Sequence, residues 1–306
     1  MRTVRAVAQL RSKLEPARRE GLTIGLVPTM GALHEGHLSL IRHARSHCDV
    51  VVVSLFVNPA QFNERADLER YPRRECDDAE LAATAGADVL FAPSVDEVYP
   101  PGFATSVEVL GVTERLEGVH RGSEHFRGVA TVVTKLLCMA LPDIAYFGQK
   151  DAQQVVVIRR LVADLNLPVR IEALATVREP DGLAMSSRNA LLAPDERSRA
   201  LALPAALAAA RALTATGERS AAALLDAAHE AMRPFGVEPE YLALVDPHTL
   251  EPLDTLPLPG GCDGRALLAL AARIGEVRLI DNEILHAPTA ASTSQPLPRK
   301  ATTCSA

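Results

Sequence analysis

The fold of this chain is decided by the stretch Thr23-Ile24-Gly25-Leu26-Val27-Pro28-Thr29-Met30-Gly31-Ala32-Leu33-His34-Glu35-Gly36-His37. Its first six residues predict a strand, and a helix follows in which Leu38, Ile41 and Ala44 share one face. A strand that leads directly into a helix is the unit from which parallel sheets are wound. The turn between them then lies at the carboxyl end of the strand, where such sheets bind ligands.

The same alternation continues through the first 178 residues. Residues 50–56 form a near-continuous apolar run, which is typical of a strand buried on both faces of a parallel sheet. Further strands are expected at 88–91, 144–147 and 169–174. Helices are expected around 77–85, over an amphipathic segment with apolar residues at 129, 132, 133, 136 and 137, and over a segment with Val155, Ile158, Leu161, Val162 and Leu165 facing inward. We therefore predict a Rossmann-like parallel-sheet α/β domain over residues 1–178.

The composition changes after about Arg188. Residues 193–232 are rich in Ala and Leu and predict two helices broken near Gly217, and strand-like runs follow at 241–245, 266–270 and 277–280. Helices followed by strands indicate a smaller C-terminal α+β domain, which we expect over residues 179–286 as a lid. Residues 287–306 show no periodicity and are rich in Ala, Thr, Ser and Pro, so we expect a disordered tail there.

Composition and charge exclude several classes of protein. The chain has 306 residues, is 48% hydrophobic, and carries 32 Lys and Arg against 38 Asp and Glu, so it lacks the basic field of a nucleic-acid binder. No apolar run approaches the roughly 20 residues that span a bilayer, and the N-terminus lacks the apolar core of a secretory signal. The five scattered cysteines contain no C-x-x-C pair and are expected to be reduced. We expect a cytoplasmic protein without nucleic-acid or membrane partners.

Two histidines, His34 and His37, lie at the expected N-terminus of the first helix. Free backbone N–H groups and the positive end of the helix dipole suit phosphate there. Gly36 lets a ligand approach the backbone without meeting a Cβ. The spacing of three places both histidines on one helical face, and each can donate hydrogen bonds to phosphoryl oxygens, more strongly when protonated.

Other interpretations of this pair are less well supported. A zinc site would use the same two histidines, but Glu35 is misplaced for H-E-x-x-H and no third ligand is evident. The absence of G-x-G-x-x-G disfavours a dehydrogenase. Two surface histidines with no ligand are the plain alternative.

A second motif, Met185-Ser186-Ser187-Arg188-Asn189, follows the 169–174 strand and the turn 180–182. Two hydroxyls and a guanidinium in a loop after a sheet strand suit a mobile clamp on triphosphate oxygens. Alone the motif is weak, because serines are common in polar turns. Together with H-x-G-H it reproduces the two signatures of the nucleotidyltransferase superfamily, His-x-x-His and a K-M-S-K-S-like loop.

Three more clusters narrow the interpretation. Asn58-Pro59-Ala60-Gln61-Phe62 follows the second expected strand, Tyr71-Pro72-Arg73 precedes Asp77 and Asp78, and Phe147-Gly148-Gln149-Lys150-Asp151-Ala152-Gln153-Gln154 follows the 144–147 strand. There Asp151 can cap a helix, Gly148 admits a ligand, and Lys150 supplies a point charge for phosphate. The amides of Gln61 and Gln154 suit hydroxyl and carboxylate groups of a small substrate. As isolated surface residues these would be ordinary, but their place after strands favours a site.

These ordered motifs resemble the pantoate–β-alanine ligase (pantothenate synthetase) family, from about Val27 to Leu285. The resemblance rests on P-T-M-G-A-L-H-E-G-H, F-V-N-P-A-Q-F, Y-P-R, H-F-R-G-V-A-T-V-V-T-K-L, F-G-Q-K-D, Q-Q, D-G-L-A-M-S-S-R-N and L-I-D-N. One departure is visible, because the family commonly reads F-G-E-K-D and Gln149 replaces that acid here. We expect the change to be tolerated, since Lys150 and Asp151 remain.

The resemblance implies a two-step ligase that makes pantothenate. Pantoate's carboxylate attacks the α-phosphate of ATP and pyrophosphate leaves; the amine of β-alanine then attacks pantoyl adenylate, releasing AMP. It implies that His37 is the proton donor, with His34, Lys150 and Arg188 as further catalytic groups. Contacts with ATP are implied for Met30, Gly31, Ala32, Leu33, His34, Glu35, Gly36, His37, Gly148, Gln149, Lys150, Asp151, Val177, Met185, Ser186, Ser187 and Arg188.

Further implications concern the other ligands. Gln61 and Gln154 are implied to hold pantoate, with Gln61 also near β-alanine. Mg²⁺ should bridge the phosphates, and Asp77 or Asp78 is a candidate to assist it. The resemblance also implies a homodimer.

Three rival functions share part of this pattern. A cytidylyl- or adenylyltransferase would keep the nucleotide on its product, and the F-V-N-P-A-Q-F and Q-Q clusters argue against it. A tRNA-charging enzyme has both signatures, but the second half of the chain shows no basic stripe for RNA. A nucleotide-sensing module would bind ATP without releasing pyrophosphate.

Overall fold

The computed structural model of the protein describes residues 1–62, 65–258 and 264–287. Its elements in chain order are β1 (Arg2–Val4), α1 (Val7–Arg19), β2 (Ile24–Thr29), α2 (Glu35–His47), β3 (Val50–Leu55), η1 (Pro59–Gln61), α3 (Arg65–Arg70), α4 (Glu75–Thr84), β4 (Val89–Phe91), α5 (Val95–Val98), α6 (Glu117–Ala140), β5 (Ile144–Gly148), η2 (Gln149–Asp151), α7 (Ala152–Asp164), β6 (Arg170–Leu174), η3 (Ser187–Leu191), α8 (Pro194–Arg199), α9 (Ala202–Ala215), α10 (Ala221–Met232), η4 (Arg233–Phe235), β7 (Pro239–Val245), β8 (Arg265–Ile274) and β9 (Val277–His286).

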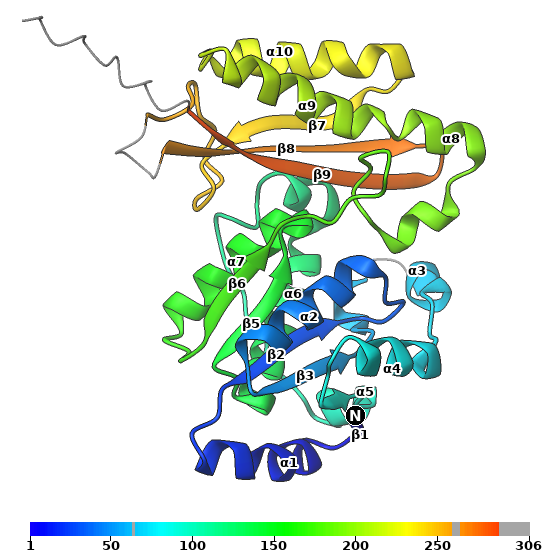
Figure 1. The fold of residues 1–306 in the computed structure, drawn as a ribbon, viewed down its shortest axis with the longest axis vertical. Coiled ribbons are helices and arrows are strands. Elements are labelled where there is room, and N and C mark those ends of the chain that lie inside the picture. Colours follow the sequence, from blue (N-terminus) through cyan, green and yellow to red (C-terminus); the bar gives the residue numbers. More distant parts are fainter. Residues whose placement is uncertain (63–64, 259–263, 288–306) are drawn as a thin grey trace, which may run out of the picture.

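The first part of the chain forms a parallel sheet with strand order β1-β4-β3-β2-β5-β6 (Figure 1). The chain runs from β2 outward through β3 and β4, then returns so that β5 pairs with the other side of β2. The direction of winding therefore reverses between β2 and β5. A crevice opens at such a reversal, outside the carboxyl ends of the strands. The prediction of a Rossmann-like α/β domain is confirmed.

Helices cover both faces of this sheet. The apolar side chains of α2 and α4 pack on one face, and those of α1, α6 and α7 pack on the other. The valines and leucines predicted to face inward on α6 are all buried. On α7 the prediction is wrong at Leu165, which is 47% exposed because the helix ends at Asp164.

The second part of the chain forms an antiparallel sheet of order β7-β8-β9. Helices α9 and α10 cover its face away from the parallel sheet (Figure 1), with a break at Gly217 as predicted and an unpredicted short helix, α8, before them. The opposite face contributes Leu267 and Ala269 to a small cluster with Ala152 and Val156 of α7. This apolar contact seats the antiparallel sheet on the carboxyl edge of the parallel one.

Some predicted boundaries differ from the observed elements. Neither β1 nor α1 is predicted from the sequence, because three residues are too few to show a period and Pro16 interrupts the helical pattern. The division at residues 178 and 179 stays a prediction. Ala287, expected to begin the tail, is buried in the core between the antiparallel sheet and the helices α9 and α10, and residues 288–306 lie outside the described part of the chain.

None of the helices in the described part is both long and apolar enough to cross a membrane.

Candidate active site

A pocket of about 1080 Å³ opens at the carboxyl ends of β2, β3, β5 and β6 and is bounded on its far side by the antiparallel sheet. It brings together the predicted site residues Met30, His34, Gly36, His37, Gln61, Gly148, Lys150, Asp151, Gln154, Val177, Met185, Ser186, Ser187 and Arg188. The predicted residues that do not line it are Gly31, Ala32, Leu33, Glu35, Asp77, Asp78 and Gln149. Residues as far apart in sequence as Pro28 and Asn282 thus share one cavity.

The spacing of His34 and His37 predicts that both lie within the helix on one face. In the structure only His37 lies within the helix. His34 is the N-cap residue of α2 with extended backbone, and His37 lies in the first turn. Their ring centroids are 4.2 Å apart. The Nδ1 atom of His34 accepts from the backbone N–H of Gly36 (3.1 Å), and Nδ1 of His37 accepts from that of His34 (3.4 Å). Each neutral ring therefore carries its proton on Nε2, where it can donate to a ligand.

Both histidines have a lowered pKa, which favours the uncharged rings over the protonated form that would donate more strongly. Burial, followed by the electrostatic effect of the neighbouring His34, lowers the pKa of His37 to about 3. Burial and the nearby Lys150 also lower the pKa of His34. The two rings are hydrogen-bond donors, and the positive charge near them comes from Lys150.

Glycine is required beside His34 for a reason other than the predicted ligand approach. A Cβ at Gly36 would lie 2.8 Å from Cε1 and 3.0 Å from Nδ1 of the His34 ring. Any larger residue would therefore displace the imidazole. Gly36 makes room for the capping side chain as well as lining the pocket.

The turn before the histidines is shaped by a buried carboxylate, Asp78 of α4. Its oxygens accept from the backbone N–H groups of Ala32 (3.0 Å) and Leu33 (2.7 Å). Gly31 lies there at φ +97°, and a Cβ would meet Asp78 Oδ2 at 3.0 Å. Gly31 and its two neighbours thus form the turn rather than line the pocket, and Glu35 pairs with Arg42 outside it.

The structure gives the predicted magnesium contacts of Asp77 and Asp78 no support. Asp78 is 2% exposed and already accepts two backbone hydrogen bonds, while Asp77 is exposed on α4 and does not line the pocket. Among the residues that the structure describes, no group of three or more His, Cys, Asp or Glu side chains could hold a metal ion.

Replacing Asp78 with asparagine is expected to lower both stability and turnover. The new amide would turn its NH₂ toward a backbone N–H, so one buried donor loses its acceptor, at a cost of about 1–3 kcal/mol. The turn that positions His34 would loosen, and the rate should fall with it. Thermal unfolding and steady-state rates measure both effects. Asp77→Asn is the matched control on the same helix, and a parental rate and melting temperature for Asp78→Asn would contradict the positioning role.

Gln61 is oriented by buried neighbours. Its Oε1 accepts from Nδ2 of Asn58 (3.1 Å), and Asn58, 1% exposed, also donates to the carbonyl of Gly128 and accepts from the Tyr99 hydroxyl. The Gln61 Nε2 atom lies 2.7 Å from the sulfur of Met30. The amide donor is thereby held on the β2 side of the pocket.

The segment after β5 places Lys150 and Asp151 in the pocket and turns Gln149 away from it. The Gln149 amide donates to Oδ1 of Asn282 on β9 (3.3 Å), and Asn282 Nδ2 donates to the carbonyls of Gln149 (3.0 Å) and Lys150 (2.9 Å). Asp151 is at the N-cap position of α7, but its side chain makes no capping hydrogen bond, so the predicted capping role is wrong. The carboxylate of Asp151 instead lines the pocket beside Lys150.

The Met185–Arg188 loop is anchored at both ends. The backbone N–H of Met185 donates to the carbonyl of Val177 (2.9 Å), and the side chain of Asn189 donates to Glu179 (2.6 Å) and to the carbonyl of Ala184. Ser186 caps the short helix η3 by accepting from the N–H of Arg188 (3.2 Å). The loop thus reaches the pocket between two fixed points.

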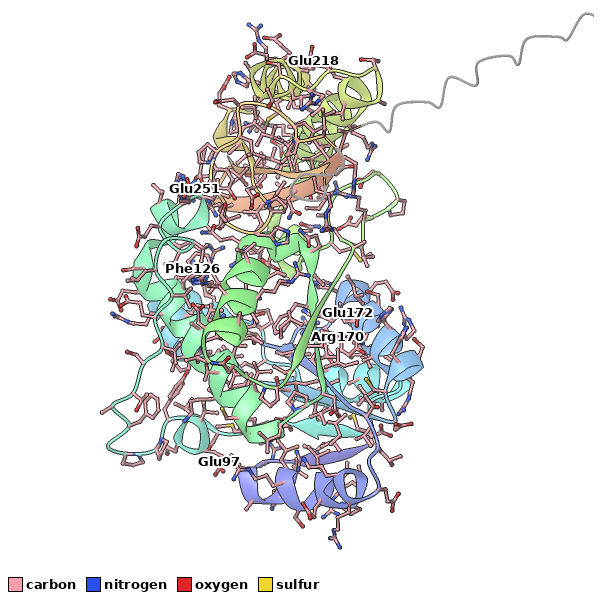
Figure 2. All side chains as sticks on the ribbon, turned by 90° about the vertical axis from the view of Figure 1, so that its left-hand side faces the viewer. Glu97, Phe126, Arg170, Glu172, Glu218 and Glu251 are labelled. Carbon is pink, nitrogen blue, oxygen red and sulfur yellow. The ribbon has the colours of Figure 1, made fainter. Side chains whose placement is uncertain are left out.

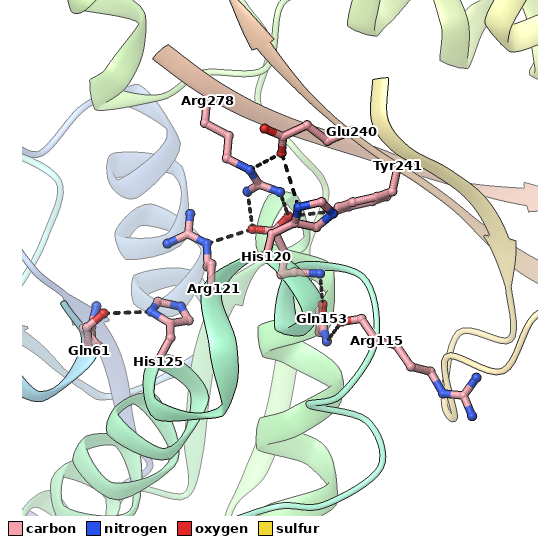
Figure 3. Close-up of polar contacts among 10 residues, drawn as sticks. Gln61, Arg115, His120, Arg121, His125, Gln153, Glu240, Tyr241 and Arg278 are labelled. Atoms are coloured by element: carbon pink, nitrogen blue, oxygen red, sulfur yellow. Dashed lines mark hydrogen bonds and ion pairs between the residues drawn. The ribbon is translucent and has the colours of Figure 1, made fainter. Parts of the chain in front are cut away.

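The sequence analysis missed an ion-pair cluster on the far side of the pocket (Figure 3). Glu117 of α6, whose side chain is 8% exposed, accepts from both terminal nitrogens of Arg278 (2.7 and 2.8 Å), from Arg121 Nε (2.8 Å) and from the Tyr241 hydroxyl (2.9 Å). Burial alone would raise the pKa of Glu117, but its hydrogen bonds with Arg278 and the charge on Arg121 prevail and lower it to about 2. Because Arg278 and Tyr241 come from β9 and β7, Glu117 fastens the antiparallel sheet to α6.

Two further contacts involve residues near this cluster. His125 donates from Nδ1 to the carbonyl of Gln61 (2.8 Å), and burial followed by the charge on Arg121 lowers the pKa of His125 to about 4. Arg115 pairs with Glu251 at 2.6 Å. Figure 2 shows Glu251 where the antiparallel sheet meets the rest of the chain. The i, i+4 spacing of Glu117 and Arg121 was the one local signal for this cluster. By itself this spacing predicts only an ion pair between two side chains on the surface of one helix.

Comparisons with known proteins identify the family of this chain. A sequence model of the family described as Pantoate-beta-alanine ligase matches residues 2–284. The pantothenate synthetase of Cereibacter sphaeroides is 52% identical over 279 residues, 91% of this chain and 98% of the relative, and that of Heliobacterium modesticaldum is 51% identical over 290 residues, 94% and 100%. The crystal structure of pantothenate synthetase from Thermus thermophilus is similar with a TM-score of 0.85 at 47% identity, covering 92% of this chain and 99% of that one.

A further solved structure carries ligands. It is the pantoate-beta-alanine ligase from Francisella tularensis, complexed with beta-gamma ATP and beta-alanine, and it matches with a TM-score of 0.75 at 35% identity over 93% of this chain and 97% of that one. The family model spans nearly all of the described residues, and the relatives are covered almost completely. The chain therefore belongs to the pantoate–β-alanine ligase family.

Proposed function

We propose that the pocket between the two sheets is where this chain joins pantoate to β-alanine, using ATP and passing through pantoyl adenylate. The chain is a pantothenate-forming ligase by its family. The observation that supports this pocket as its site is the convergence of the H-x-G-H turn, Gln61, the Lys150 segment and the Ser186–Arg188 loop on one cavity. The structure of the Francisella relative is described as a complex with beta-gamma ATP and beta-alanine, and ATP and β-alanine are the two ligands expected here besides pantoate.

In the first step the residues of this chain place positive charge and hydrogen-bond donors around the phosphoryl oxygens of ATP. The Nε2–H groups of His34 and His37 can donate to phosphoryl oxygens, and Lys150 supplies a full positive charge beside them. Ser187 and Arg188 reach the pocket from the opposite loop. Attack of a carboxylate on phosphorus needs little covalent chemistry from the protein, so positioning and charge stabilisation are the main contributions.

Magnesium fits this site as a partner of the nucleotide. Such ions are commonly held by substrate phosphates and one or two carboxylates, and they neutralise charge on the phosphates. Asp151, which lines the pocket directly after Lys150, is the carboxylate we propose for this contact in place of Asp77 and Asp78.

In the second step the acyl group must be held while the amine attacks. Gln61 and Gln154 line the pocket with amide groups suited to the hydroxyls and carboxylate of pantoate. The orientation of Gln61 by Asn58 fixes one donor before the substrate arrives. A homodimeric state and a cytoplasmic location remain predictions from the resemblance and the composition.

The two half-reactions can be separated by isotope exchange. If the adenylate forms before the amine is needed, pantoate should support exchange of labelled pyrophosphate into ATP in the absence of β-alanine. AMP should form only when both pantoate and β-alanine are present. A chain that bound ATP without exchange would be a nucleotide-sensing module, and one that left the nucleotide on its product would be a nucleotidyltransferase.

A further inference from the structure

The L-I-D-N motif at residues 279–282 lies on β9, which forms one edge of the antiparallel sheet. Neither Asp281 nor Asn282 has a role in the proposed reaction, yet both line the active-site pocket. Asp281 is 2% exposed and Asn282 is 5% exposed. Burying such polar side chains is unfavourable unless their atoms are hydrogen-bonded, so the partners of these two residues are informative.

Asp281 holds the hairpin that leads into the Met185–Arg188 loop. Its carboxylate accepts from both terminal nitrogens of Arg178, at 2.7 and 3.1 Å, and Nη1 of Arg178 also donates to the carbonyl of Gly182 at 3.0 Å. Arg178 and Ala184 pair as the two antiparallel arms of this hairpin, and the loop begins directly after Ala184. A two-pronged contact between a guanidinium and a carboxylate fixes direction as well as distance, so it sets how the loop enters the pocket.

Asn282 holds the segment that carries Lys150. Its Nδ2 atom donates to the backbone carbonyls of Gln149 (3.0 Å) and Lys150 (2.9 Å), and its Oδ1 atom accepts from the Gln149 amide (3.3 Å). Because two of these contacts are with main-chain carbonyls, they fix the backbone from which the Lys150 side chain enters the pocket.

Adjacent residues of one strand can hold both segments because successive side chains point to opposite faces of a sheet. Asn282 pairs with Ala269 of β8, which lies in the apolar cluster with α7. Asp281 pairs with Leu270, which lies with Leu183 of the hairpin in the core under α9 and α10. One dipeptide thus connects the segment after β5 with the hairpin after β6.

We propose that Asp281 and Asn282 are positioning residues for the triphosphate of ATP. Together they set the separation between Lys150 and the Met185–Arg188 loop. Asp281 acts through Arg178, which does not itself line the pocket. The inference rests on the proposed function, in which these two segments hold the phosphates from opposite sides. Groups that are fixed before the ligand arrives bind it more tightly, since binding then does not have to order them.

Calorimetric titration of the full chain tests the proposal, with ATP that carries a methylene group between its α- and β-phosphorus atoms as the probe. Affinity for this analogue should fall about tenfold or more in Asn282→Leu, which matches asparagine in shape but leaves two carbonyls without their donor. It should fall similarly in Asp281→Asn, which removes the charge that Arg178 binds. Glu283→Gln is the matched control and should bind like the parent, because Glu283 lies on the same strand but pairs with Arg211 of α9.

Pantoate affinity is the second measurement, because a purely structural role would weaken the binding of every ligand alike. Measured with the analogue saturating, it should stay close to the parental value. The reason is that Gln61, proposed to hold pantoate, is oriented by Asn58 and not by β9. Circular dichroism shows whether each variant is folded. The double variant Arg178→Gln, Asp281→Asn removes both charges of the pair and should show the same loss, so it replaces Asp281→Asn if that variant does not fold.

Parental affinity for the analogue in folded Asn282→Leu and Asp281→Asn would overturn the proposal. So would equal losses of analogue and pantoate affinity, or the same loss in Glu283→Gln. A parent chain that binds the analogue but forms no pantothenate would refute the proposed function alone, and the comparison of the variants would still be interpretable. A parent chain that does not bind the analogue at all would refute both.

Discussion

Replacing His37 with alanine should slow the formation of pantoyl adenylate by about 10²–10³-fold while leaving the fold intact. The imidazole is half-buried in the pocket wall, and its Nε2–H is the donor that can stabilise charge developing on the phosphoryl oxygens. Removing it leaves that charge with one fewer fixed hydrogen-bond donor. Rapid-quench measurement of the first turnover, with circular dichroism for the fold, gives the size of the effect.

His47→Ala is the matched control, because His47 is an exposed histidine on the same helix. It should adenylate pantoate at the parental rate. The low pKa of His37, about 3, adds a second expectation. His37 stays uncharged at every pH well above 3, so its titration should not appear in the pH profile of adenylation between about pH 5 and 8. Near-parental adenylation by folded His37→Ala would remove the residue from the reaction.

Replacing Glu117 with glutamine should destabilise the protein by about 3 kcal/mol, the lower end of the cost of breaking a buried ion pair. Arg278, whose side chain is 14% exposed, would lose its two-pronged partner and keep only Glu240. Arg121 and Tyr241, which donate to the two oxygens of Glu117, would have to share the one remaining amide oxygen with Arg278. Urea unfolding at neutral pH measures the loss, and turnover should fall too because the antiparallel sheet is fastened over the pocket by this side chain.

Acid provides an independent check on Glu117. Its pKa in the folded state, about 2, lies below the ordinary value of 4.5, so its stabilising effect is present above about pH 4.5 and is lost as the pH falls toward 2. A shift of this size corresponds to about 3 kcal/mol. The gap in stability between the parent and Glu117→Gln should therefore narrow toward pH 2.

Glu251→Gln is the comparison for this variant. It breaks the exposed pair with Arg115 at the same junction, and such pairs contribute about 1 kcal/mol or less. Equal effects of Glu117→Gln and Glu251→Gln would mean that the buried cluster does not hold the two sheets together.

The sequence by itself determined the parallel sheet and most of the site. The apolar runs at residues 24–29 and 50–55 form buried strands in the structure, and the helices after them bury the apolar faces that the sequence indicates. These local patterns are informative because helices cover both faces of this sheet. Many residues that line the pocket follow strand ends directly, so the turn at 34–37, Gln61 and Lys150 could be proposed as candidates from their place in the chain.

Tertiary structure decided which of these residues reach the pocket and in what state. Asp78 lies 45 residues from the N–H of Leu33 that it holds, and Glu117 lies 161 residues from Arg278, so no local pattern reveals either partnership. The charge state of His37 depends on how deeply the folded chain buries it, which residue type and spacing do not specify. Hydrogen bonds and desolvation act at a few ångströms, and only the packed fold brings such distant groups that close.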